Sequence, residues 1–186
     1  LRLKSGVAPI KSFFEKNIPV ALGIDEAGIN DDRDMLQEMR LVLMIHQKPG
    51  IGTCSLNSSD VLRMATEFGA RTTPYGDSIG QLSKGSEADL IILNHKKMVY
   101  PYQSEDINIV DVLLQRTKPK AVETVLVAGE VVYNEGNFIK VNRDRILSEI
   151  AEGLSYPLSK EEMKRQELAR SVFPHVKKFY EDHYQY

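Results

Sequence analysis

A short apolar run that ends on a carboxylate constrains this chain more than any other feature. Residues Val20–Ile24 are apolar apart from Gly23, and Asp25 follows them directly. A run of this length predicts a buried strand. After a polar loop, an amphipathic pattern with acidic residues near its start predicts a helix over residues 32–47. Strand, loop and helix in this order indicate a unit of an α/β fold.

Asp25 is the candidate catalytic residue of this unit. In α/β barrels, the catalytic groups stand where the strands end and the following loops begin. An Asp at such a position also has an ordinary structural role, because its short side chain stabilises turns and helix starts. The pattern leaves both interpretations open.

Further helices flank this unit in the first part of the chain. Helical patterns cover residues 8–16, where Pro9 suits the first turn, and residues 59–68, which we expect to be capped by Asn57, Ser58 or Ser59 and to end at Gly69. Residues 1–77 are therefore expected to form βα units and the helix that follows them, and the resemblance described below implies that these are the last βα units of a barrel.

The remaining residues divide into a strand-rich region and a helical tail. Short apolar runs bounded by turn residues predict strands over residues 79–82, 88–93, 124–128 and 131–133. The last two are joined through Gly129-Glu130 as a hairpin, and a helix over residues 108–115 lies outside the ladder. We assign residues 78–142 to strands of a small β-sandwich and residues 143–186 to helices over 143–155 and 160–183.

Composition excludes several classes of function. The net charge of −2 argues against binding to a nucleic-acid backbone, which requires an excess of basic residues. No apolar run reaches the length of a transmembrane helix, so no membrane partner is expected. The single cysteine, Cys54, excludes an intrachain disulfide and favours a cytoplasmic location.

Four ordered segments resemble the amidohydrolase superfamily. Residues 21–41, ALGIDEAGINDDRDMLQEMRL, resemble the segment around the eighth barrel strand, and LKSGVAP, residues 3–9, resembles the loop after the seventh. Residues 61–94 resemble the helix and strands that leave the barrel, and residues 122–138 resemble its closing hairpin. The similarity is to the branch of metal-dependent deaminases and chlorohydrolases that act on cytosine, methylthioadenosine, S-adenosylhomocysteine, guanine and triazines.

The resemblance implies a divalent metal, zinc or iron, in the complete enzyme. Asp25 matches the family's aspartate ligand after the eighth strand. The histidine ligands of the family have no counterpart, because the histidines of this chain lie elsewhere, at positions 46, 95, 175 and 183. We therefore expect this sequence to be the C-terminal portion of a longer enzyme, and we expect no metal to be bound by this chain alone.

The implied reaction is hydrolysis of an amino- or chloro-substituted heterocycle by a metal-bound hydroxide, with Asp25 as ligand and proton acceptor. Glu26 and Asn30 lie in the loop after it, where substrate pockets are shaped. Glu26 is an expected contact to a substrate amine, with an exposed solvent-facing role as the alternative. Asn30 is a candidate substrate contact, but its stronger role is that of a helix cap.

Other interpretations remain open at the level of sequence. One alternative is a non-catalytic structural or assembly module that lacks the metal-binding histidines. Another is a different barrel hydrolase of the superfamily, resembling imidazolonepropionase or dihydroorotase. The expected partners are a small heterocyclic substrate and the missing N-terminal segment or a companion chain, with a homo-oligomer as a further option.

Overall fold

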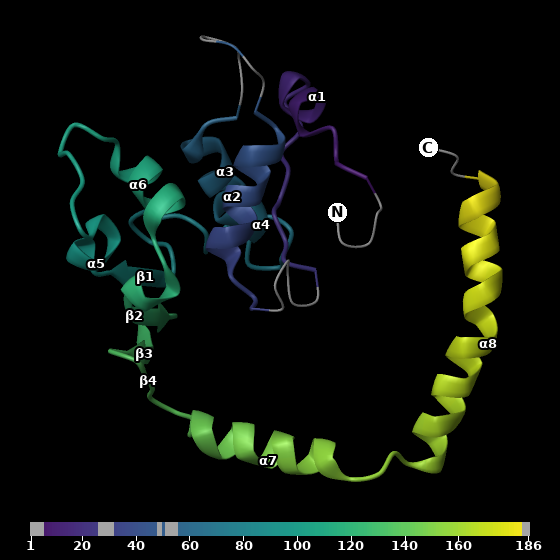
Figure 1. Cartoon of the computed structure of the whole chain (residues 1–186). Helices are drawn as coiled ribbons and strands as arrows, with labels where there is room; N and C mark the ends of the chain where they lie inside the picture. The colour runs from purple at the N-terminus through teal and green to yellow at the C-terminus, as the bar shows by residue number, and fades with distance from the viewer. Residues whose placement is uncertain (1–5, 26–31, 48–49, 51–55, 184–186) are drawn as a thin grey trace. The chain divides into compact units, whose positions relative to one another are not determined.

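The computed structural model describes residues 6–25, 32–47, 50 and 56–183 (Figure 1). The chain divides into two compact units, residues 1–140 and 141–186, and each is described by itself. The first unit contains a helical part followed by a small antiparallel sheet. The second contains two helices.

The helical part of the first unit is built on four helices near its N-terminus: α1 (Ile10–Glu15), α2 (Met35–Ile45), α3 (Ser58–Ala65) and α4 (Glu67–Ala70). Its core joins α1, α2 and α3 to a later helix, α6 (Ile109–Arg116). The fully or almost fully buried members of this core are Ile10, Met39, Val42, Leu43, Val61, Met64 and Leu114. The apolar stripes of α2 and α3 thus face one another, as amphipathic helices require.

The start of α2 corrects the predicted boundary. The helix begins at Met35, and its N-cap is Asp34, whose carboxylate accepts a hydrogen bond from the Leu36 N–H at 2.9 Å. The preceding residue, Arg33, has a φ of 54° and therefore cannot continue a right-handed helix toward Asp32. Asp32 instead accepts a hydrogen bond from the Asp34 N–H at 3.2 Å.

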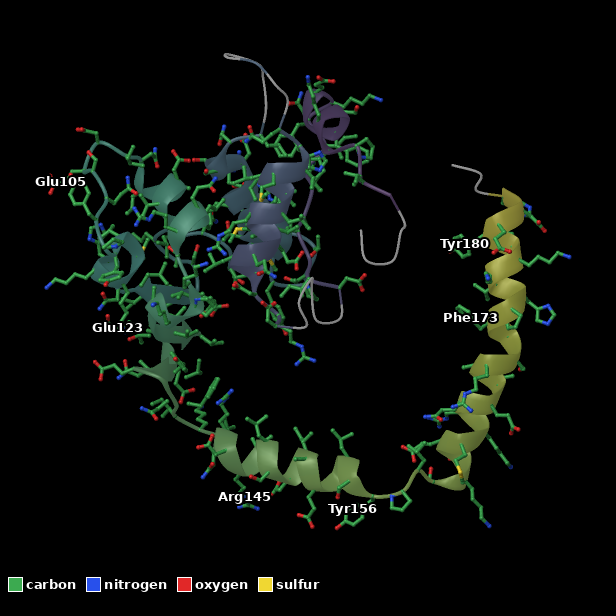
Figure 2. All side chains as sticks on the ribbon, in the orientation of Figure 1. Glu105, Glu123, Arg145, Tyr156, Phe173 and Tyr180 are labelled. Carbon is green, nitrogen blue, oxygen red and sulfur yellow. The ribbon has the colours of Figure 1, made fainter. Side chains whose placement is uncertain are left out.

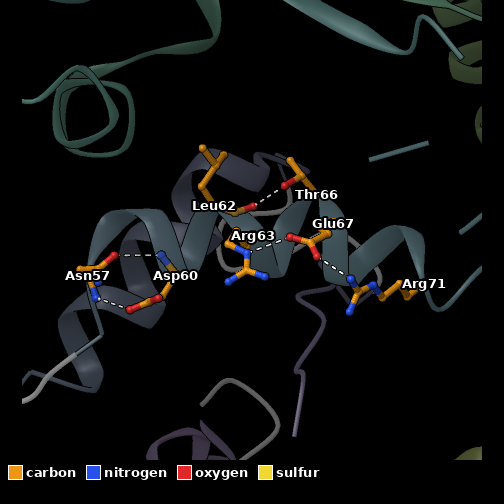
Figure 3. Close-up of polar contacts among 7 residues, drawn as sticks. All are labelled: Asn57, Asp60, Leu62, Arg63, Thr66, Glu67 and Arg71. Atoms are coloured by element: carbon orange, nitrogen blue, oxygen red, sulfur yellow. Dashed lines mark hydrogen bonds and ion pairs between the residues drawn. The ribbon is translucent and has the colours of Figure 1, made fainter. Parts of the chain in front are cut away.

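Helix α3 begins with a complete capping box, and of the three candidate caps, Asn57, Ser58 and Ser59, the N-cap is Asn57. The Asn57 side chain accepts from the Asp60 N–H at 3.0 Å, and the Asp60 carboxylate accepts from the Asn57 N–H at 3.1 Å. The expected end at Gly69 is wrong, because α3 stops at Ala65 and Gly69 lies within α4. The chain bends at Thr66, whose hydroxyl donates to the Leu62 carbonyl at 2.8 Å (Figure 3).

Residues 20–24 are extended but form no strand, which corrects the prediction. Val20, Leu22 and Ile24 are half-buried and alternate with exposed Ala21 and Gly23. The alternation shows that one side of the segment packs on the helices while the other is open. A strand needs a neighbouring strand to complete its hydrogen-bond ladder. In the described part of the chain none pairs with this segment.

Residues 79–82 also form no strand, contrary to expectation. They belong to a series of turns that packs against α4. Gly80, at φ 84°, lies so close to that helix that an added Cβ would stand 2.6 Å from the Ala70 Cβ and 2.9 Å from the Thr66 carbonyl oxygen. Glycine is therefore required here because a side chain would clash with the neighbouring helix, and its presence does not indicate a strand.

The other predicted strands form one antiparallel sheet with the order β1-β2-β3-β4. Strand β1 (Leu90–Leu93) pairs with β2 (Val122–Val127), which forms the expected hairpin with β3 (Glu130–Asn134). A further short strand, β4 (Asn137–Phe138), pairs with β3 and was not predicted. Its turn contains Gly136 at φ 93°, so the signal for a second hairpin was present in the sequence.

A second small core lies beside the sheet. It contains Met98 of α5 (His95–Val99), Val112 of α6 and Ala121 of a 3₁₀ turn, η1 (Pro119–Ala121). Helix α6 confirms the predicted helix between the strands. Helix α5 is not among the predicted elements, and the Asn94 side chain caps it by accepting from the Lys97 N–H at 3.1 Å.

The second unit consists of α7 (Arg143–Ser155) and α8 (Lys160–His183), which confirm both predicted tail helices. Neither helix has a buried residue. Apolar side chains recur at helical spacing on α7 as Ile146, Ile150 and Leu154, all exposed. No helix in the described part of the chain combines the length and apolar composition needed to cross a bilayer.

An ion-pair chain on the surface of α3 and α4 predicts a pH dependence (Figure 3). Glu67 accepts hydrogen bonds from Arg63 at 2.8 Å and Arg71 at 2.5 Å. The hydrogen bond from Arg63 is the main cause that lowers the pKa of the Glu67 carboxyl. A lowered folded-state pKa contributes stability above the unfolded pKa, about 4.3, which is lost as the pH falls through the folded value.

We therefore expect Glu67→Gln to lower the midpoint of thermal unfolding slightly near neutral pH and to have no such effect well below about pH 4. The measurement is a pair of circular-dichroism melts of each protein at the two pH values. Glu87→Gln is the matched control, because Glu87 is exposed and has no ion pair within the described residues. An equal destabilisation by Glu67→Gln at both pH values would contradict the ionic origin of the effect.

Candidate active-site segment

Asp25 stands at the end of the extended segment, at the first residue of a turn. Its φ is 52°, in the left-handed region that Asp and Asn occupy more readily than most residues. Its side chain is exposed. The left-handed backbone suits a turn-forming Asp, and the exposed carboxylate is available to a ligand, so the local geometry accommodates both predicted roles.

Helix α3 positions this segment by a backbone contact. The Leu22 N–H donates to the carbonyl of Met64 at 3.0 Å, three residues before Asp25. Val20 and Leu22 also pack against the core in which Met64 is completely buried. The location of Asp25 therefore depends on α3, which sequence reasoning missed, because a backbone carbonyl as acceptor leaves no side-chain signal.

The turn after α1 fixes the other end of the segment. The Ile18 N–H donates to the Phe13 carbonyl at 2.8 Å, and the Asn17 N–H donates to the Phe14 carbonyl at 2.9 Å. Asn17 has a φ of 55°, which a residue of this type tolerates. The chain thus reverses immediately after α1 and enters the extended segment in one defined direction.

Of the other predicted site residues, Glu26 and Asn30 lie outside the described residues. The interpretation of Asn30 as the cap of the next helix is wrong, because Asp34 occupies the N-cap of α2. A cap must immediately precede the first helical turn to reach its free N–H groups.

The histidines are spread over separate elements of the chain. His46 is the C-cap residue of α2, and His95 is the first residue of α5. His183 lies on α8, where its Nδ1 is 2.9 Å from the Phe179 carbonyl oxygen and its ring stacks on that of Phe179.

The residues that the structure describes include no group of three or more His, Cys, Asp or Glu side chains placed to hold a metal ion. A catalytic zinc site takes three protein ligands and keeps one position open. The described residues, Asp25 included, do not complete such a set.

The fold and the sequence together define the class of this protein. The sequence profile of the amidohydrolase family matches residues 1–132, from the first residue into β3. The chain therefore belongs to the amidohydrolase family. The matched region includes α1–α6, Asp25, strands β1 and β2 and the start of β3.

Individual relatives are enzymes of known type. The chain is 29% identical over 160 residues to a 5'-deoxyadenosine deaminase of Methanococcus maripaludis, covering 86% of this chain and 36% of that protein. It is 31% identical over 147 residues to a 5-methylthioadenosine/S-adenosylhomocysteine deaminase of Carboxydothermus hydrogenoformans, covering 78% and 33%. The chain thus spans about a third of the length of the curated relatives it matches.

A solved structure confirms the likeness of fold. The atrazine chlorohydrolase of Arthrobacter aurescens, complexed with zinc, superimposes with a TM-score of 0.71 at 22% identity, covering 81% of this chain and 33% of that one. The family match and this likeness of fold confirm the predicted fold class, C-terminal units of a metal-dependent hydrolase fold with a small sheet.

The cap that precedes α2 gives a second prediction. Asp34→Ala removes the side chain that accepts from Leu36 and should lower the free energy of unfolding by about 1 kcal/mol. Asp34→Asn should be close to neutral, because Asn caps helices as well as Asp does. Urea unfolding of both variants measures the difference. A destabilisation of equal size in both would contradict the capping role.

Proposed function

We propose that this chain supplies the C-terminal third of a metal-dependent hydrolase that acts on amino- or chloro-substituted heterocycles, with Asp25 as its catalytic carboxylate. The observation that carries the proposal is the position of Asp25. It is an exposed carboxylate at the end of an extended segment that α3 holds in place, inside the region matched by the amidohydrolase profile. Carboxylates in this position serve catalysis in α/β barrels.

Deamination of an adenosine-like substrate is the preferred reaction. The two curated relatives are named as deaminases of 5'-deoxyadenosine and of methylthioadenosine or S-adenosylhomocysteine. Displacement of chloride from a triazine is the alternative, supported by the similarity to atrazine chlorohydrolase. In either case Glu26 and Asn30, which follow Asp25 in sequence, are proposed to contact the substrate.

In this proposal the metal is zinc or iron, and this chain contributes only Asp25 to it. The remaining ligands come from a segment outside this sequence, because the described residues do not complete a site. A bound divalent metal in such an enzyme activates water at neutral pH. We assign residues 1–77 to the barrel, 78–142 to the sheet region and 143–186 to a helical tail, and we place the protein in the cytoplasm.

A non-catalytic assembly module is the second candidate. It is favoured by the lack of any three-ligand cluster within the described residues. The two candidates differ in what happens when the missing part is supplied, because only the hydrolase gains metal and turnover.

The test is a chimera in which the N-terminal part of the Methanococcus maripaludis deaminase precedes residues 1–186. We expect the chimera to bind metal and to release ammonia from 5'-deoxyadenosine. Asp25→Asn should keep the fold and reduce turnover by about 10²–10⁴-fold, the loss typical for removal of a general base. Ammonia release and metal content by mass spectrometry are the two measurements.

Asp77→Asn is the matched control, because Asp77 is an exposed carboxylate elsewhere in the same unit and should leave both quantities unchanged. Normal turnover and metal content in the Asp25 variant would show that this residue only forms the turn. A chimera that folds without binding metal or turning over substrate would favour the assembly module.

A further inference from the structure

Three lysines and a tyrosine line an open cavity beside the second core, far in sequence from Asp25. We call it the basic pocket, and its residues are Lys96 and Lys97 of α5, Tyr100 just after this helix, and Lys120 of η1. Its volume is about 430 Å³. Neither the family match nor the proposed function assigns a role to this pocket.

The fold places these residues together through a small set of backbone contacts. The Asn94 N–H, at the start of α5, donates to the carbonyl of Ala121 at 2.8 Å and so ties α5 to η1. Met98 and Ala121 are both buried in the second core, which anchors one side of each element. The lysines on the other sides of α5 and η1 are exposed and meet around the cavity.

The wall that carries Tyr100 is fixed by Arg116 at the end of α6. The Arg116 guanidinium donates to the carbonyl of Tyr100 and to that of Tyr102, each at 2.8 Å. It also donates to the Gln103 side chain. The loop after α5 is thereby held by one cation, while the Tyr100 side chain remains 76% exposed.

The charge of the basic pocket is uncompensated within the described structure. No carboxylate belongs to its lining, and none of its three lysines forms an ion pair with a described residue. Glu123, labelled in Figure 2, accepts instead from the side-chain amide of Asn94 at 3.0 Å. By contrast, Lys140 pairs with Glu130 at 2.6 Å. Three lysines that line one cavity without a counter-ion among the described residues create a positive potential that attracts anions.

We propose that the basic pocket binds a small phosphorylated molecule. Three ammonium groups match the charge of a phosphate or pyrophosphate, which lysine binds as a point charge. The cavity volume lies within the range of small-molecule sites. The Tyr100 ring and the aliphatic stems of the lysines offer an apolar surface for the body of the ligand. The shared chemistry is therefore a phosphate group, either free or attached to a planar group such as a base.

The test is calorimetric titration of the full 186-residue chain with inorganic pyrophosphate and, separately, with uridine monophosphate. A uridine nucleotide avoids binding to a site for adenosine-like substrates. We expect saturable binding of at least one probe that weakens as salt is raised, because salt screens these exposed charges. The triple variant Lys96→Gln, Lys97→Gln and Lys120→Gln should bind at least about tenfold more weakly.

The matched control replaces three exposed lysines outside the pocket by Gln: Lys16, Lys84 and Lys164. It makes the same change in net charge and should retain wild-type affinity. Circular dichroism of both triple variants checks that each is folded. Tyr100→Leu separates the two ligand sources. If the Tyr100 ring contacts a base, this variant should bind the nucleotide more weakly and pyrophosphate with unchanged affinity. If free phosphate is the ligand, it should bind both probes with unchanged affinity.

Three outcomes would overturn the proposal. The first is that neither probe binds saturably, the second is that both triple variants lose affinity equally, and the third is that a folded pocket variant binds as the wild type does. The second outcome would show that net charge alone attracts the anion. These outcomes are independent of the Asp25 chimera, because the basic pocket contains no residue of the proposed active site.

Discussion

The first unit depends on α6, because this helix contributes buried side chains to both of its cores. Leu114 of this helix is completely buried in the larger core with α1, α2 and α3, whereas Val112 is buried in the smaller core with α5 and η1. The Arg40 side chain on α2 donates to the Leu114 carbonyl at 2.6 Å and also to that of Thr117. A cation at the last carbonyls of a helix satisfies acceptors that have no partner within the helix.

Helix α6 connects the two places to which we assign function. On one side, α6 supports the core that holds α3, and α3 in turn holds the segment ending at Asp25 through the Met64 carbonyl. A hydrogen bond from Ser58, at the start of α3, to Asp111 of α6 adds a polar contact between the same helices. On the other side, α6 carries Arg116, which fixes the loop that bears Tyr100. A disruption of α6 is therefore expected to affect both sites.

The candidate active site illustrates how a family relationship and a local geometry complement one another. Asp25 lies within the region that the profile matches and at the end of the extended segment, but a single carboxylate does not make a metal centre. The chain covers about a third of each relative described above. What this chain provides is a positioned carboxylate together with the sheet and helices that follow it, and the proposed chemistry requires further ligands.

The sequence by itself determined the features that depend on local patterns: the tail helices α7 and α8, helices α2 and α6, a polar cap among residues 57–59 and the hairpin of β2 and β3. The sequence also indicated Asp25 and the family, because the four ordered motifs can be recognised without knowledge of tertiary contacts. Only the tertiary structure decided that residues 20–24 and 79–82 are not strands. Residues 20–24 have no neighbouring strand to pair with among the described residues. Residues 79–82 pack closely against α4 at Gly80, a contact that the local sequence does not reveal. The basic pocket likewise escaped prediction, because its lysines come from separate elements that only the second core brings together.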